Sequence, residues 1–468
     1  MLHFIRPLST ALTIALMAGV PAYGQEGLDD ALGGFDGGEF DGGGDFDQPA
    51  PPTPPPAIPR AAPSPWSLSG AFTFSAAYDY TQNAPQTGEY DKRGLSRVRP
   101  KVALQLKGNF PNQLPRPVRI VSELTIRDEQ VYAIRGRDDY PEPVKNSFER
   151  DLNIGELYAN VQFNDAFEVT AGRQIVVWGS AENLRVVDIL NPLDQREIGM
   201  VDIEDLRLPV AMVRADYVSG PWTTTVMAIP EIRLNKTAPA RSAFDASNGA
   251  PPPQDTPADD LANMEFAARV QGNFSGWDVA LQAANVFNDG AHKETVQGVT
   301  RLRHARVNMV GVSADMAVGN WLFKGEAATI NGLKTLAVPN RDFTRSDVLL
   351  GLEVSTIADL SISAEVVNRH LYGWDATLKA EGLRQDTQEY ALRISGDYLR
   401  DRLHLSALMS RLSPLARGGG FSRASVAYDL QDALTITGGI TLYRGGTRAP
   451  FKGLGDNDRV FLEIKKSF

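Results

Sequence analysis

The strongest constraint on the fold of this chain is a two-residue hydrophobic alternation that begins at Trp66 and continues to the C-terminus. In residues 97–107, for example, Val98 and Leu104 fall on one face and Lys101 falls on the other. A period of two is typical of β-strands whose two faces meet different surroundings. The alternation predicts an all-β fold for residues 66–468.

The pattern divides into eighteen predicted strands. They are 66–80, 95–107, 117–131, 151–163, 166–178, 208–218, 220–228, 262–274, 276–286, 303–315, 319–330, 346–356, 358–370, 387–398, 401–412, 419–430, 432–444 and 457–468. A soluble sandwich would also alternate, so the lengths of the connections must distinguish the two folds. The exact number of strands stays open between 16 and 18.

Short and long connections follow one another along the chain. Tight turns such as 275–276 and 431–432 alternate with long connections such as 179–207 and 229–261. Short turns on one rim and long loops on the other are typical of transmembrane β-barrels, and strands of about ten residues suit a tilted bilayer crossing. We therefore predict a transmembrane antiparallel β-barrel of about eighteen strands, with short periplasmic turns and long outer loops.

Two further features agree with a barrel in the outer membrane of a Gram-negative bacterium. The chain ends on Phe468 in an alternating strand, which resembles the C-terminal signal of such barrels, although Lys466 departs from that signal. Tryptophans also stand beside predicted short turns, where an interfacial aromatic girdle would lie, and the alternative is four core tryptophans. They are Trp66, Trp222, Trp277 and Trp321.

The N-terminus predicts export. Residues 1–24 combine Arg6, an apolar segment and small residues near a cleavage site, as in a secretory signal peptide. Residues 25–65 follow as an acidic Gly/Asp segment and then a Pro-rich segment, neither of which can bury a core. We predict that residues 25–65 are a disordered periplasmic tail. Either its residues 25–48 dock on a periplasmic or inner-membrane transporter component, or the tail is only a solvated extension.

Composition removes several functional classes. The net charge of −10 disfavours nucleic acid as a partner, and the absence of cysteine removes thiolate and iron–sulfur chemistry. The five histidines are scattered, and the sequence has no G-x-S-x-G, H-E-x-x-H or P-loop motif. We expect no enzymatic activity, no catalytic residue, no cofactor and no metal site.

The lumen of a transmembrane barrel is lined by polar side chains, and here both signs of charge are present. The second and third predicted strands carry a local basic wall. It comprises Arg97, Arg99, Lys101, Arg119 and Arg127. The wall either guides an anion or is neutralised by Glu123 and Glu156 on neighbouring strands.

One long connection differs from the others in its composition. Residues 180–206 are too apolar for a free outer loop, so we predict that they fold into the lumen as a constriction held by arginine–carboxylate pairs. Whether the loop is a gate or a static plug stays open. The residues assigned to this constriction are Arg173, Trp178, Arg185, Asp188, Asn191, Asp194 and Arg207.

The same region resembles a family of Gram-negative outer-membrane barrels that carries a domain of unknown function. The matching positions are Gly172-Arg173-Gln174, Trp178-Gly179, Asp188 and Asn191-Pro192-Leu193-Asp194. The resemblance implies a barrel over residues 66–468 and an association with transporters of the resistance-nodulation-division type. It further implies a role in moving hydrophobic or lipid-like compounds.

Three functions remain open from the sequence. The first is an outer-membrane channel of an envelope system for hydrophobic or lipid-like compounds, which the resemblance favours. The second is a diffusion porin or polysaccharide export channel, which a polar lumen would also suit. The third is a structural or adhesive barrel. We expect the barrel to be surrounded by outer-membrane lipid. The sequence pattern does not indicate the substrate, the direction of transport or the oligomeric state.

Overall fold

The computed structural model describes residues 64–468, apart from 112–113, 202, 247–250, 336–337, 339–340, 356–358, 416 and 448. The predicted signal peptide (1–24) and nearly all of the predicted tail (25–65) lie outside the described residues.

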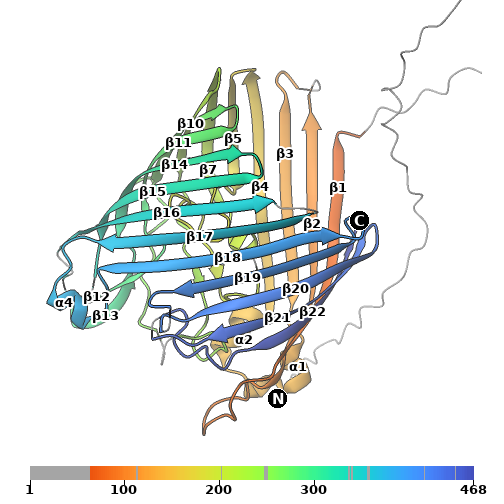
Figure 1. The fold of residues 1–468 in the computed structure, drawn as a ribbon, viewed down its shortest axis with the longest axis vertical. Coiled ribbons are helices and arrows are strands. Elements are labelled where there is room, and N and C mark those ends of the chain that lie inside the picture. Colours follow the sequence, from red (N-terminus) through yellow and green to blue (C-terminus); the bar gives the residue numbers. More distant parts are fainter. Residues whose placement is uncertain are drawn as a thin grey trace, which may run out of the picture. The chain divides into compact units, whose positions relative to one another are not determined.

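Eighteen antiparallel strands form one closed sheet (Figure 1). They are β1 (Trp66–Asp79), β2 (Gly94–Phe110), β3 (Val118–Asp128), β4 (Arg150–Asn164), β5 (Phe167–Gln174), β7 (Val210–Ser219), β8 (Trp222–Ile229), β10 (Glu265–Phe274), β11 (Trp277–Phe287), β14 (Arg306–Val318), β15 (Trp321–Leu333), β16 (Phe343–Ser355), β17 (Leu360–Leu371), β18 (Asp386–Tyr398), β19 (Leu403–Leu412), β20 (Gly420–Gln431), β21 (Leu434–Arg444) and β22 (Arg459–Ser467). Each strand pairs with its neighbours in the sequence, and β1 pairs with β22. The prediction of a closed antiparallel barrel is confirmed, with the strand count at eighteen.

The predicted strands correspond one to one to the observed strands, but some of their ends differ. The predicted strand 166–178 stops early, since β5 ends at Gln174 and the chain then turns into the barrel. Small elements also interrupt the long connections, where a rule based on alternation detects no structure. They are α1 (Val131–Arg135), η1 (Arg137–Asp139), α2 (Glu142–Phe148), β6 (Asp194–Gln195), α3 (Ile203–Leu206), β9 (Lys236–Thr237), β12 (His292–Val296), β13 (Val299–Arg303) and α4 (Ala376–Ala380).

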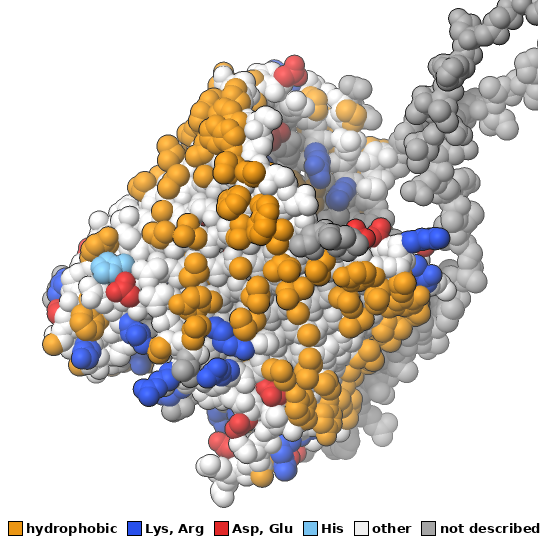
Figure 2. All heavy atoms as spheres, in the orientation of Figure 1, with side chains coloured by type: hydrophobic (Ala, Val, Ile, Leu, Met, Phe, Trp, Pro, Cys, Tyr) orange, Lys and Arg blue, Asp and Glu red, His pale blue; other side chains and the backbone are white. Residues whose placement is uncertain are grey.

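The outward face of the barrel is strongly apolar. Leu350 and Val310 are 65% and 66% exposed, and many other large apolar side chains on the strands are similarly uncovered. Figure 2 shows hydrophobic side chains spread across the strands on the visible face of the barrel. Apolar surface of this extent is unfavourable in water and matches the hydrocarbon core of a bilayer.

Aromatic side chains mark the rim that carries the short turns. Trp66, Trp222, Trp277 and Trp321 are each the first residue of a strand, and all are between 42% and 46% exposed. The Trp277 ring stacks on Phe274 with a centroid distance of 4.3 Å. The tryptophans therefore form a girdle and are not core residues.

Among the described helices, none is long enough and apolar enough to cross a membrane.

The connection between β5 and β7, residues 175–209, is here called the lumen loop. Its buried apolar side chains, including Trp178 and Val187, form one cluster with strand residues such as Met212, Met309 and Leu349. The predicted insertion of this loop is thus observed. The expectation that only polar side chains face the lumen is wrong on this side of the barrel, because the loop replaces water there as the neighbour of the wall.

The absence of native cysteine allows the topology to be tested with single introduced thiols. Leu261→Cys, in the connection after β8, is at a position that is 82% exposed, and it should react with an impermeant maleimide on intact cells. Asp165→Cys, in the turn between β4 and β5, should react only after the outer membrane is permeabilised. Equal labelling of the two variants on intact cells would contradict the assigned rims.

Candidate channel constriction

Asn191 holds together the two ends of the lumen loop. Its side chain is fully buried, and its Oδ1 accepts a hydrogen bond from the Val176 backbone N–H at 2.7 Å. Its Nδ2 donates to the backbone carbonyls of Gln174 (3.2 Å) and Leu208 (2.9 Å). A side-chain amide can serve both donors and acceptors of a buried backbone, so Asn191 satisfies groups on both strand ends at once.

Asp188 is the centre of charge within the loop. Its buried carboxylate accepts hydrogen bonds from Arg185 Nε (3.1 Å) and Arg207 Nε (3.0 Å). Arg185 also donates to the carbonyl of Asn191 at 2.8 Å. Charge-assisted bonds in a buried site are strong and geometrically specific, so this triad fixes the fold of the loop. Trp178, which is 2% exposed, packs in the same cluster and its backbone N–H faces Asp188 Oδ1 at 3.5 Å.

Two carboxylates of the barrel wall bind the backbone of the loop. Glu326 on β15 accepts hydrogen bonds from the backbone N–H groups of Ser180 (3.0 Å), Ala181 (3.0 Å) and Val187 (3.3 Å). Glu365 on β17 accepts from those of Glu182 (2.8 Å), Asn183 (3.0 Å) and Leu184 (2.9 Å). Each carboxylate therefore satisfies three backbone donors that have left water.

The alternation along β15 and β17 places Glu326 and Glu365 in the lumen but gives them no particular role. A carboxylate that binds backbone N–H groups can lie beside residues of any type, so this role leaves no pattern in the sequence. The same holds for Lys324, which bonds both Glu182 of the loop (2.6 Å) and Glu353 of β16 (2.9 Å).

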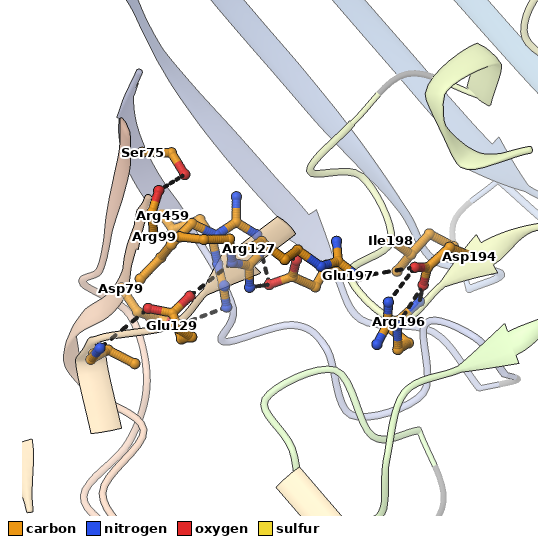
Figure 3. A network of polar contacts seen from close by, with 12 residues as sticks. Ser75, Asp79, Arg99, Arg127, Glu129, Asp194, Arg196, Glu197, Ile198 and Arg459 are labelled. Atoms are coloured by element: carbon orange, nitrogen blue, oxygen red, sulfur yellow. Dashed lines mark hydrogen bonds and ion pairs between the residues drawn. The ribbon is translucent and has the colours of Figure 1, made fainter. Parts of the chain in front are cut away.

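The far end of the loop is bound to the basic wall through Glu197 (Figure 3). Its carboxylate lies 2.6 Å from Arg97 Nη2 and 2.8 Å from Arg99 Nη1. Arg99 Nε also contacts Glu129 at 3.0 Å. Burial opposes ionisation of Glu197, but the two guanidinium groups hold the pKa of its carboxyl well below its usual range. The carboxylate is therefore ionised and binds the loop to β2.

A second set of ion pairs lies beside it. Arg196 of the loop contacts Asp194 Oδ1 through Nε at 2.8 Å (Figure 3). It also lies 3.0 Å from Asp151 of β4. Arg127 of the basic wall donates to Asp151 from Nε at 3.1 Å and lies 3.5 Å from Asp194. Burial works against the Asp194 charge, yet Arg196 lowers the pKa of its carboxyl.

The arginines of the basic wall are thus neutralised mainly by the loop and by acids at the ends of β3 and β4. The alternative partners named from the sequence are engaged elsewhere. Glu123 accepts from Gln105 (2.5 Å), and Glu156 accepts from the Ile175 backbone N–H (2.9 Å). In the described part of the chain, Lys101 and Arg119 make no ion pair, and Arg119 lies toward the short-turn end of β3.

One predicted member lies apart from the constriction network. Arg173, near the end of β5, pairs with Glu231 in the next long connection, with Nε 3.0 Å from Oε2. Glu231 also accepts the Ala211 backbone N–H at 2.7 Å. Arg173 therefore supports the entry to the loop, and among the described residues its ion pair is with Glu231 and not with the loop interior.

Two cavities lie beside the loop. The first, here called the apolar chamber, measures about 440 Å³ and is lined by outer strand ends and by side chains such as Phe287, Ile330 and Leu412. The second, here called the basic chamber, measures about 470 Å³ and includes Arg97, Lys101 and Arg127 of the basic wall. The loop thus has a cavity on each of two sides.

The described residues contain no group of three or more acidic or histidine side chains arranged to hold a metal ion. His304 is engaged by the Asn288 carbonyl (2.8 Å) and the Gln254 amide (2.9 Å).

The fold resembles those of solved outer-membrane porins. OccK9 (OpdG) of Pseudomonas aeruginosa has a TM-score of 0.51 at 10% identity, covering 86% of this chain and 98% of that one. The BenF-like porin of Pseudomonas fluorescens Pf-5 has a TM-score of 0.51 at 9% identity, covering 86% and 97%. OccAB3 of Acinetobacter baumannii has a TM-score of 0.50 at 10% identity, covering 86% and 99%.

No curated protein matches the sequence. A family model does match, over residues 69–468, which is nearly the whole barrel, and its description is "Protein of unknown function (DUF1302)". The chain is therefore a member of the DUF1302 family.

Proposed function

We propose that the protein is an outer-membrane channel, the outer-membrane part of an envelope system that moves hydrophobic or lipid-like compounds. The observation that carries the proposal is a closed barrel with an apolar outer face, whose lumen is crossed by one inserted loop with a cavity on each side. A structural barrel needs no such internal spaces. The porin fold of the similar structures supports a channel in the outer membrane.

The lining of the apolar chamber favours hydrophobic cargo over small polar solutes. Seventeen of its thirty lining residues are apolar, and they come both from the loop and from the wall. A diffusion porin or a polysaccharide exporter would be expected to present polar side chains along its whole path. A role beside a resistance-nodulation-division transporter is part of this proposal and rests on the family resemblance.

The tail supplies a route to such a transporter. Residues 25–48 contain eight acidic and no basic residues, together with three Phe-Asp pairs. A following Pro-rich spacer reaches about 3 Å per residue when extended. We propose that the acidic segment docks on a basic apolar groove of a periplasmic or inner-membrane component.

The constriction is tested by removing the charge at its centre. Asp188→Ala leaves the buried Arg207 and the half-buried Arg185 without their shared partner. Removing one partner of a buried ion pair lowers the free energy of unfolding by about 3–5 kcal/mol, so the loop should loosen. The barrel should still assemble because the hydrogen bonds between strands are untouched. We expect a higher single-channel conductance in planar bilayers, approaching that of a deletion of 180–206.

Asp278→Ala is the control, since Asp278 is also an aspartate but lies on the strand β11 and lines neither chamber. Its conductance should equal that of the unchanged protein. If Asp188→Ala and the deletion of 180–206 both leave conductance and solute passage unchanged, the loop is not the constriction.

The docking role of the tail is tested by deleting 27–48. Insertion and conductance should be unaffected, because the first strand begins at Trp66. Co-purification with a transport component should be lost, and in the full chain the same contact should weaken as salt screens its charges. A deletion that blocks barrel assembly, or that loses no salt-sensitive partner, would disprove the docking proposal.

A further inference from the structure

The lumen loop separates two chambers of opposite chemistry. Along residues 193–208, the side chains that border the apolar chamber include Leu193 and Ile198. Those that border the basic chamber include Asp194, Arg196 and Arg207. The segment thus presents an apolar side to one space and a charged side to the other.

The two spaces adjoin each other. Val201 and Leu206 line both chambers, so these two side chains are a shared boundary. A molecule that reaches past these two side chains contacts both linings. Each chamber also lies within the range of about 300–1,000 Å³ that is typical of small-molecule sites.

The basic chamber carries more positive charge than its own acids balance. Eight cationic and five acidic side chains line it. Lys101 and Lys465 line it without an ion pair in the described part of the chain, and both stand directly opposite Thr73, one on each neighbouring strand.

Lys101 also stands opposite Arg127 in the register of β2 and β3. Like charges placed directly across two strands destabilise a sheet. Arg127 is compensated by Asp151, but Lys101 and Lys465 have no such partner among the described residues, so an anion bound in the chamber would relieve this repulsion.

The apolar chamber keeps its own charges compensated. Arg185 pairs with Asp188, and Arg369 pairs with Glu389 at 3.1 Å. Asp289, which also lines the chamber, lies in the connection after β11, and burial raises its pKa to about 8. It is therefore largely uncharged at neutral pH, which preserves an apolar lining.

We propose that the cargo is an amphipathic anion, whose apolar body occupies the apolar chamber while its carboxylate or similar head reaches the basic chamber past Val201 and Leu206. The inference rests on the proposed channel function and specifies its substrate class. A neutral hydrocarbon would leave the cationic row unused, and a small polar anion would leave the apolar lining exposed to water.

The test is calorimetric titration of the full chain in lipid nanodiscs, with empty nanodiscs subtracted. The probes are octanoate, butyrate, octyltrimethylammonium and 1-octanol. Octanoate should bind more tightly than butyrate by on the order of one hundredfold, because four further methylenes are buried. It should also bind more tightly than octyltrimethylammonium, which has the same tail and the opposite charge.

Substitutions in each chamber test which chamber binds the charged head of the probe and which binds its apolar tail. The double variant Lys101→Gln and Lys465→Gln should weaken octanoate binding by on the order of tenfold and leave 1-octanol unchanged, since it removes only interactions with charge. Lys107→Gln, on the same strand but outside the chamber, should change neither. Ser410→Trp, which fills the apolar chamber, should weaken both, and Ser410→Leu serves if the larger side chain prevents insertion.

Equal binding of octanoate and octyltrimethylammonium, or an unchanged octanoate affinity in the double lysine variant, overturns the inference. Conductance distinguishes this failure from that of the proposed function. A chain that conducts ions but shows no preference for octanoate is a channel for other cargo. A chain that binds octanoate selectively but passes neither ions nor solute has the amphiphile site without the channel.

Discussion

Closure of the strand ladder is the constraint on which the rest of this structure depends. Hydrocarbon offers no hydrogen bonds to an exposed backbone, so a sheet in a bilayer cannot keep a free edge. Here β1 accepts β22 as its second neighbour, and Gly70 and Phe468 exchange two backbone hydrogen bonds of 2.9 Å at the last contact. Once closed, the wall can tolerate an irregular segment inside it, because that segment meets protein and not lipid.

The lumen loop meets the same requirement that every buried backbone N–H group has a hydrogen-bond acceptor. A loop that leaves water must find acceptors for its N–H groups, and the wall supplies them from Glu326 and Glu365. The acids at the other end of the loop, Asp194 and Glu197, are matched to wall arginines instead. On one side, acidic side chains of the wall bind the loop backbone. On the other side, basic side chains of the wall bind carboxylates of the loop, so the loop is held from two directions.

The sequence predicts the barrel well and the interior poorly. Alternation, turn length and terminal residues are local signals, and they suffice for strands as far apart as β1 and β22. They also single out the apolar loop and its Asp188 and Asn191. They do not reveal which strand each charge meets, so Arg173 was grouped with a network that it does not join, and the hydrogen bonds of Glu326 to the loop backbone were not predicted. Those partnerships depend on strand register and on the path of the loop, which no local pattern records.

The clamp made by Asn191 has a consequence for how such a protein can diversify. Because one side chain ties Gln174, Val176 and Leu208 together, the loop enters and leaves the wall at a single fixed point. Loop side chains that make no contact with the wall can therefore differ between related barrels without a shift in the register of β5 and β7. Changes at those positions would alter the selectivity of the interior while the barrel wall stays the same.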